Sequence, residues 1–473
     1  MNKKYIFLIM VLLAAGAFVF LDHFPSGKGK KQIGPYKYIK EARLYLKEEK
    51  YEKAVNLLHK AYEEAPESKG VRKNLINGYM LHAKDLDGKG QLDKAINNLE
   101  IAYEMDPDNV DLKHYLAYLY SRKAAEESSR GAYDRTSQCL QKATDMAKGS
   151  KKTRRNISTY LFNRAVEAFN KSENKTVILF LNTSYNLWRR ADPLIFMGQY
   201  YYGESNFERA LFYWNKARDL RPDDPEINKK IEMARKEVML KKKMREIKTE
   251  HFDIRFYRDY QINADILQET LLPIYEQVSL DLDYYLPMST PVFFYTGGDF
   301  REIFQKKGII RAFYDGNIRM IFIADINDPM FAALIAHEYT HAVISILTDN
   351  RCPVWLHEGM ATYEQGRYIP ISIEPVKTAL KGGKSLSIEE LEKGFESADN
   401  IPALALGYTG SYAAVSFIID EWGWPGLRDL LHRIKDGRHF TNAVDEEFYI
   451  SIGEFENMFN EWMRKKLGIE EGA

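Results

Sequence analysis

The chain has 473 residues, too many for one ordinary hydrophobic core, so we expect at least two domains. Hydrophobic residues make up 45% and charged residues 28% of the chain, a balance that argues against a disordered protein. Lysine plus arginine equals aspartate plus glutamate at 67 each, so the net charge gives no reason to expect a nucleic-acid partner. Two cysteines are too few for a disulfide framework.

The N-terminal segment has the pattern of an export signal. Lys3 and Lys4 precede an uncharged apolar run from Tyr5 to Phe20, which is typical of a secretory signal or a signal anchor. The run is close to the lower limit for crossing a bilayer. Large residues stand where a signal peptidase would need small ones. The pattern therefore favours an uncleaved anchor, formed by residues 1–24, rather than a cleaved signal peptide. We therefore expect the bulk of the chain to lie outside the cytoplasm.

Residues 35–240 repeat with a period of about 34 residues, and the repeats end in proline. Counting back from each proline reaches alanines at the same two offsets. The pairs are Ala61 and Ala54, Ala102 and Ala95, and Ala217 and Ala210. This pattern resembles the tetratricopeptide repeat, in which small residues let two antiparallel helices approach closely. The resemblance implies an all-α solenoid.

Between residues 108 and 192 the repeat pattern weakens, although the sequence still predicts helices there. The expected helices are Val110–Ser128, Tyr133–Ala147, Ile157–Phe169 and Val177–Arg189. The concave surface of such a solenoid is typical of peptide or protein binding. Residues expected on inner helices are Asn74, Tyr79, Tyr115 and Tyr118. The alternative is that the repeats only hold the C-terminal domain away from the membrane.

After residue 249 the pattern changes to that of an α+β domain. The basic run at 241–245 is expected to be a solvated turn that closes the last repeat helix. Phe252, Ile254 and Phe256 alternate with polar residues, as in a strand. Further predicted elements are a helix at 261–284, a strand at 292–295, a turn at 315–317 and a strand at 318–324. An extended peptide could pair with this last strand.

His337, Glu338 and His341 form an HExxH motif inside an apolar segment that ends at Leu347. Residues four apart face the same way on a helix, so both imidazoles can bind one metal ion with Glu338 beside them. This is the arrangement of a zinc hydrolase, in which the glutamate accepts a proton from the attacking water. Burying these side chains in an apolar helix would otherwise be costly, which argues against a purely structural role.

Catalytic zinc sites use three protein ligands, and the next segment offers the third. Residues 353–363 read PVWLHEGMATY. HExxH followed by WLxEGxAxY resembles the gluzincin metallopeptidases of the peptidase MA-like superfamily. The resemblance implies that Glu358 is the third ligand, that the metal is Zn2+, and that residues 249–473 form an α+β metallopeptidase domain. The repeat-plus-peptidase order and the YDGxIR motif at 314–319 resemble a bacterial envelope group, which implies that location.

Four further residues near these motifs have open roles. Aminopeptidase-type gluzincins stabilise the oxyanion with a tyrosine in a YxxG segment, and the similar segment here selects Tyr408, with Tyr412 as the alternative. His357 should point about 100° away from Glu358 on a helix, so we expect it beside the ligands rather than among them. Glu364 either supports a ligand or lies on a solvated helix face.

These features together predict an exported or membrane-anchored zinc metallopeptidase with a repeat domain for protein interaction. Endopeptidase activity is favoured because no GxMEN-type stretch, which would bind a free amino terminus, occurs in the sequence. The expected partners are a peptide or protein substrate, a protein on the repeats and the membrane. Two alternatives remain open: a non-catalytic repeat scaffold, and a zinc amidohydrolase that acts on an envelope substrate.

Overall fold

The structure, a computed structural model, describes residues 34–171, 173–304, 311–396 and 400–469. The predicted anchor over residues 1–24 lies outside the described residues. The chain divides into two compact units, residues 1–123 and 124–473. The predicted domain limits, 35–240 and 249–473, do not coincide with this division and stay a prediction.

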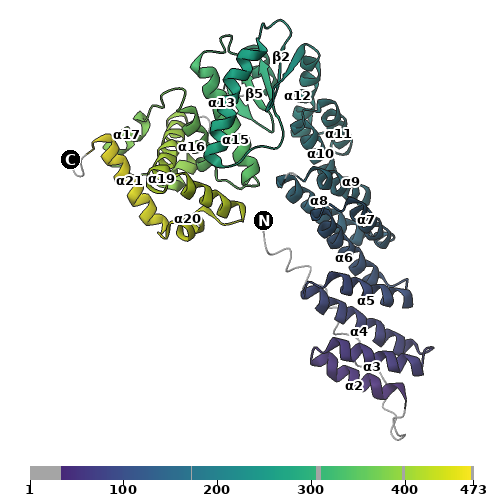
Figure 1. Cartoon of the computed structure of the whole chain (residues 1–473). Coiled ribbons are helices and arrows are strands. Elements are labelled where there is room, and N and C mark those ends of the chain that lie inside the picture. Colours follow the sequence, from purple (N-terminus) through teal and green to yellow (C-terminus); the bar gives the residue numbers. More distant parts are fainter. Residues whose placement is uncertain (1–33, 172, 305–310, 397–399, 470–473) are drawn as a thin grey trace. The chain divides into compact units, whose positions relative to one another are not determined.

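The first unit consists of helices paired as consecutive hairpins (Figure 1). They are α2 (Pro35–Lys47), α3 (Tyr51–Glu64), α4 (Lys69–Gly88), α5 (Leu92–Met105) and most of α6 (Val110–Ser129). The alanines of the repeat pattern are fully buried between the paired helices, as at Ala54 and Ala95. A Cβ on Gly78 would lie 2.7 Å from Leu58 Cδ1, so a larger residue there would require the Leu58 side chain to shift.

Tyr79 lies on helix α4, but its side chain is buried and not available on a binding surface. Its side chain is only 4% exposed, and its hydroxyl is hydrogen bonded to the His59 imidazole of the preceding helix. The Asn74 amide donates to the carbonyl oxygen of Gly70 at 2.7 Å. The Tyr115 hydroxyl donates to the Asp87 carboxylate at 3.4 Å and is half-buried. Tyr79 and Tyr115 therefore make contacts within the repeats.

The second unit begins with further helical hairpins. These are α7 (Tyr133–Ala147), α8 (Lys151–Asn170), α9 (Asn174–Leu187), α10 (Ala191–Gly203), α11 (Phe207–Leu220) and α12 (Pro225–Lys241). The helices predicted in the weakened part of the repeat pattern are thus confirmed. The hairpin of α10 and α11 shows why the pattern needs a small residue, because a Cβ on Gly198 would lie 2.2 Å from the Trp214 indole nitrogen.

A five-stranded mixed sheet follows the repeats, in the order β1-β2-β3-β5-β4. The strands are β1 (Met244–Lys248), β2 (Phe252–Tyr257), β3 (Thr290–Tyr295), β4 (Ala312–Tyr314) and β5 (Ile318–Ile321). β2, β3 and β5 are parallel, whereas β1 and β4 pair antiparallel at the two edges. Helix α13 (Ala264–Leu282) connects β2 to β3, and α14 (Gly297–Phe304) follows β3.

Two predictions about this region are wrong. Met244 and Arg245 were expected in a solvated turn but begin β1. β1 is an edge strand with a single buried side chain, and its charged residues made it look like a turn in the sequence. Residues 318–321 cannot accept a substrate strand, because β5 already pairs with β3 on one side and β4 on the other. The turn predicted at 315–317 is confirmed and connects β4 to β5, with Gly316 at a positive φ of 98°.

One face of the sheet packs against the C-terminal helices. They are α15 (Pro329–Leu347), α16 (Val354–Gln365), α17 (Glu374–Lys381), α18 (Ile388–Lys393), α19 (Ile401–Lys435), α20 (Phe440–Phe448) and α21 (Ile452–Leu467). Ile254, Val292 and Ile318 of the sheet belong to the same buried core as Phe331 and Ile335 of α15. Figure 1 shows α15 and α13 beside the sheet and α16 and α19 beyond them.

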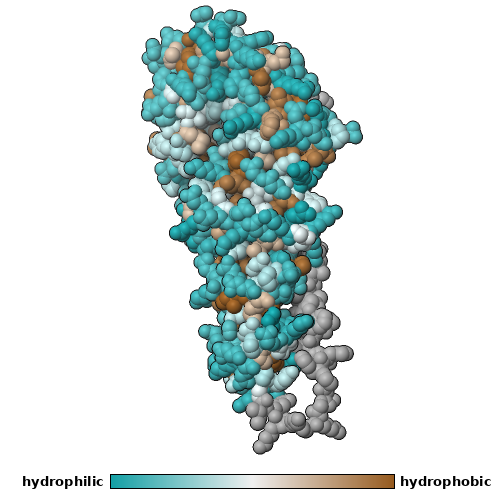
Figure 2. Space-filling model, turned by 90° about the vertical axis from the view of Figure 1, so that its right-hand side faces the viewer, coloured by the Kyte–Doolittle hydropathy of each residue, from teal (hydrophilic) through white to brown (hydrophobic). Residues whose placement is uncertain are grey.

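Two described helices, α15 and α19, are apolar enough in length and composition to cross a membrane. α15 is 72% buried inside the protein, so its composition is that of a core helix. On the face drawn in Figure 2 hydrophilic residues predominate, and hydrophobic residues form smaller patches between them.

The other face of the sheet packs against the last repeat helices through a buried polar cluster. Arg319 of β5 is completely buried and forms ion pairs with Glu237 of α12 and, at 2.9 Å, with Asp315. Glu237 also accepts hydrogen bonds from the Tyr202 hydroxyl of α10 and the Tyr295 hydroxyl of β3, at 3.1 and 3.0 Å. A Cβ on Gly316 would lie 3.3 Å from Gly203 Cα, so the β4–β5 turn lies directly against the end of α10.

The YDGxIR motif at 314–319 therefore has a structural role. Asp315 and Arg319 supply two charges of the cluster, and Gly316 permits the close turn. The motif attaches the last repeat to the sheet, so α10 to α12 and the peptidase-like domain share one buried interface. A cut at residues 240–249 would leave the Arg319 guanidinium without Glu237.

We expect Glu237→Ala to lower the free energy of unfolding by about 3–5 kcal/mol, because it leaves a buried guanidinium short of a partner. Glu232→Ala is the matched control, since Glu232 lies on the same helix with its side chain 64% exposed, and it should change stability by no more than about 0.5 kcal/mol. Urea unfolding of the full chain measures both. Equal effects of the two substitutions would contradict a stabilising role for the cluster.

Candidate metal centre

Helix α15 carries the HExxH motif through the centre of the domain. The Asp328 carboxylate accepts a hydrogen bond from the Met330 amide at 2.9 Å and so begins the helix, and Pro329 occupies its first turn. Both features favour a helix start, and the apolar residues that follow are buried on nearly every face. The helix therefore holds His337 and His341 one turn apart on a rigid, buried element.

The neighbouring helix α16 supplies Glu358 and is tightly fixed. The Glu392 carboxylate of α18 accepts hydrogen bonds from the Val354 and Trp355 amides, at 3.2 and 2.9 Å. A carboxylate at a helix N-terminus satisfies free amides and interacts favourably with the helix dipole. A Cβ on Gly359 would lie 2.5 Å from the Ser411 carbonyl oxygen of α19, so only glycine permits this approach.

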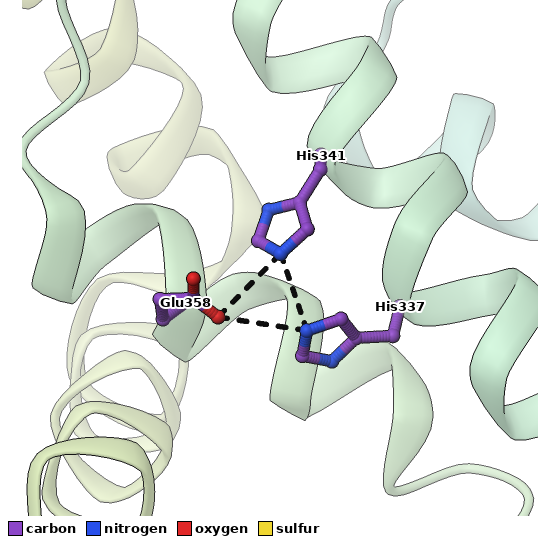
Figure 3. Close-up of side chains that lie close together, drawn as sticks. All are labelled: His337, His341 and Glu358. Carbon is purple, nitrogen blue, oxygen red and sulfur yellow. Dashed lines mark hydrogen bonds and ion pairs between the residues drawn. The ribbon is translucent and has the colours of Figure 1, made fainter. Parts of the chain in front are cut away.

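Three side-chain atoms converge where the two helices meet (Figure 3). His337 Nε2 and His341 Nε2 lie 3.2 Å apart, and Glu358 Oε2 lies 3.5 Å from each of them. The three side chains are largely buried, with exposed fractions of 12%, 9% and 19%. The structure thus brings together the three residues predicted to bind metal, which come from two helices separated by a loop.

The spacing fits zinc better than direct hydrogen bonding. A contact of 3.5 Å is too long for a good N–H···O hydrogen bond, and Glu358 Oε2 is buried without a hydrogen-bond partner among the described residues. Ligands about 2.0–2.1 Å from a tetrahedral zinc ion lie about 3.3 Å apart, close to the observed separations. Two imidazoles and one carboxylate are also a typical ligand set for catalytic zinc.

The charges of the cluster favour an ionised Glu358. Burial raises the pKa of Glu358, but the neighbouring His337 and His341 outweigh burial and hold that pKa well below its usual range. Burial lowers the pKa of His337, but the carboxylates of Glu358 and Glu338 outweigh it and the net pKa is raised. Two carboxylates next to two imidazoles form a favourable environment for a divalent cation.

Glu338 and Tyr408 complete the surroundings. Glu338 is 4% exposed and lies next to His337 in the chain. Burial raises the pKa of the Tyr408 hydroxyl, and the charges of Glu358 and Glu338 raise it further. The Tyr408 ring packs edge-on against Phe395, with ring centroids 5.1 Å apart, whereas Tyr412 lies near Tyr363. Tyr408 therefore lies within the field of the site carboxylates, and its catalytic role stays a prediction.

His357 lies beside the ligands, as its place in the sequence predicts. Its Nδ1 is 2.7 Å from His341 Nδ1, on the side of that ring opposite Glu358, and its Nε2 is 3.3 Å from Ser345 Oγ. Burial and the neighbouring His341 lower the pKa of His357 to about 3, so this imidazole is neutral. The contribution of Ser345 was missed, although Ser345 follows His341 by four residues and so occupies the same helix face.

Glu364 does not lie on a solvated helix face, so that expectation is wrong. It is 2% exposed, and its Oε2 accepts a hydrogen bond from Arg367 Nε at 2.8 Å. Arg367 also donates to the Asp281 carboxylate of α13 at 2.6 Å. Burial raises the pKa of Glu364 to about 7, against the opposing charge of Arg367. Glu364 therefore links α16 to α13 and supports the position of the helix that carries Glu358.

Comparison with known families agrees with this geometry. Residues 304–465 match the family model of the peptidase MA superfamily. This chain carries a peptidase MA superfamily domain. The match includes α15, α16 and Tyr408, and the superfamily is typically zinc-dependent. The family match supports a peptidase-like domain.

Similar solved structures include two tetratricopeptide-repeat proteins. One is a thermophilic TPR protein of Thermus thermophilus, with 15% identity over 42% of this chain and 98% of that chain, at a TM-score of 0.18. The other is the TPR domain of P58(IPK), with 14% identity over 91% of this chain and 99% of that chain, also at 0.18. The repeat fold of this chain rests on its own helical hairpins. No curated protein matches the chain.

We expect the purified full chain to hold one zinc ion and His337→Ala to hold far less, because the substitution removes one of three ligands. Elemental analysis after dialysis measures the metal content. The matched control is His432→Ala, which removes a histidine on α19 with a side chain 58% exposed. Zinc contents equal in all three proteins would show that the ligands lie elsewhere.

Proposed function

We propose that this chain is a zinc-dependent metallopeptidase, with endopeptidase action and a repeat domain for protein interaction. The observation that carries the proposal is the triangle of His337 Nε2, His341 Nε2 and Glu358 Oε2, with sides of 3.2, 3.5 and 3.5 Å. The peptidase MA superfamily match over the same residues supports it.

His337, His341 and Glu358 would hold the metal ion. Bound there, zinc would supply Lewis acidity, which polarises a carbonyl group and acidifies a water molecule. Three protein ligands are the number that is typical of a catalytic rather than a structural zinc site. The surrounding apolar core limits the access of bulk water and so strengthens every electrostatic interaction in the site.

Glu338 would act as general base and then as general acid. Its side chain is buried, and its charge acts on the neighbouring His337. It would accept a proton from the attacking water and deliver that proton to the nitrogen of the leaving amine. The Tyr408 hydroxyl, in the field of Glu338 and Glu358, would donate a hydrogen bond to the oxyanion of the tetrahedral intermediate.

The substrate is proposed to be a peptide or protein outside the cytoplasm. The basis is the signal-like segment at residues 1–24, which favours a membrane anchor, together with the resemblance of the domain order to a bacterial envelope group. Among the described strands β1 and β4 form the sheet edges, and β4 is the edge strand next to β5 and the HExxH helix. An extended substrate could pair with β4, as an edge strand, by backbone hydrogen bonds.

Glu338→Gln should lower the rate of peptide hydrolysis by a factor of about 10²–10⁴ while retaining zinc, because an amide cannot accept the proton. Glu358→Ala should lose zinc as well as activity, because it removes a ligand. Hydrolysis of an unbiased peptide library and elemental analysis measure the two effects. Unchanged hydrolysis in Glu338→Gln would exclude it as the base, and a wild type with zinc but no hydrolysis would favour the scaffold alternative.

If the first repeats recruit substrate, deleting residues 34–107 should slow the cleavage of folded proteins and leave short peptides unaffected. The reason is that a remote binding surface raises the effective concentration of a large substrate without changing the site. The cut precedes α6, whose N-terminal amides are capped by Asn109, and leaves the Glu237–Arg319 cluster intact. Zinc content is the folding control. Equal rates for both substrate types before and after deletion would leave the repeats a spacer role.

A further inference from the structure

The side of the His341 ring that faces away from Glu358 makes a specific contact. His341 Nδ1 lies 2.7 Å from His357 Nδ1, and the two ring planes are within 9° of parallel. The other nitrogen of His357, Nε2, lies 3.3 Å from Ser345 Oγ. The three side chains form a chain of contacts that starts at a proposed metal ligand and returns to helix α15 one turn further on.

Proton positions in this chain follow from the ligand atom. If His341 Nε2 binds the metal, the ring proton of neutral His341 must be on Nδ1. Two nitrogens 2.7 Å apart cannot both carry a proton along the line between them, so His357 Nδ1 must be the acceptor. The proton of His357 is then on Nε2, where it can be donated to Ser345 Oγ. Metal binding by His341 Nε2 thus determines the tautomers of both His341 and His357.

The contact arises from residue spacing on two helices. His337, His341 and Ser345 follow one another at intervals of four and so share a face of α15. His357 and Glu358 are consecutive on α16. Helix α16 therefore brings Glu358 to one side of the His341 ring and His357 to the other, and His341 is held from both sides.

We propose that His357 is a positioning residue that orients His341 and keeps its Nε2 unprotonated for the metal. The proposal rests on the proposed zinc site. Partners of this kind fix the tautomer and ring orientation of a ligand histidine, and their loss typically weakens metal binding about 10–100-fold. Here the acceptor is a neutral imidazole where a carboxylate or a backbone carbonyl is more usual, and Ser345 in turn orients that imidazole.

Three substitutions at one position separate this role from simple packing. In His357→Asn the side-chain oxygen can take the place of Nδ1 and still accept the proton of His341. In His357→Gln the terminal amide takes the place of Nε2, so the contact with Ser345 remains and that with His341 is lost. His357→Leu loses both. We expect Zn2+ affinity of the full chain, measured by chelator competition, to fall about 10–100-fold in Gln and Leu and less than about threefold in Asn.

Packing or the Ser345 contact alone would predict the reverse order for Asn and Gln, and that order would overturn the proposal. Equal affinities in all four proteins would overturn it while leaving the proposed function intact. A wild type that hydrolyses no peptide and binds no Zn2+ would reject the proposed function and this proposal together. Thermal unfolding of the zinc-free proteins shows whether each variant folds.

A second measurement needs no substitution in the contact. Two-bond 15N–1H correlation spectra of the zinc-loaded wild type report which nitrogen of each histidine carries the proton. We expect the Nδ1–H form for His341 and the Nε2–H form for His357, with His432→Ala as an assignment control on an exposed histidine. An Nδ1–H form of His357 would contradict the proposed role even if every variant failed to fold.

Discussion

Burial of polar side chains on a central helix is the constraint on which this domain depends. α15 is enclosed by the core on nearly every face, yet it carries His337, Glu338 and His341. Such groups are costly to bury unless they are paired, hydrogen bonded or bound to a metal. The surrounding elements provide this compensation: Glu358 faces both histidines, and His357 meets the far side of His341. The contacts among the site residues therefore offset the cost of burying polar side chains on α15.

Helix α16 must be held firmly for the same reason, because it delivers Glu358 and His357 together. Its N-terminus is capped by Glu392, its middle approaches α19 at Gly359, and its end is tied to α13 through Glu364 and Arg367. Each contact is made by a different neighbouring element. A small displacement of α16 would move a ligand atom and its support at the same time, which explains why three separate contacts restrain it.

A second buried cluster joins the last repeat to the sheet. Arg319 and Glu237 come from β5 and α12, and Tyr295 and Tyr202 complete their hydrogen bonding. Because of this cluster, the boundary between the two sequence patterns is not a boundary between independent structural units. A linker drawn at residues 240–249 separates two sequence patterns, but the physical interface runs through α10 to α12. The repeats nearest the sheet thus help to stabilise the domain that carries the metal site.

Local sequence patterns were enough to predict the helical hairpins and part of the candidate site. The spacing of alanines and prolines predicted the helical hairpins, and a four-residue interval predicted that His337 and His341 share a helix face. These features depend on neighbours along the chain, so the sequence alone reveals them. Glu358 was predicted from resemblance to a family, because local sequence does not show where the loop after α15 places the next helix. The role of Arg319, the burial of Tyr79 and Glu364, and the central position of β5 were decided by tertiary structure. Each depends on a partner far away in the sequence, and a charged or aromatic residue looks the same in sequence whether it meets water or such a partner.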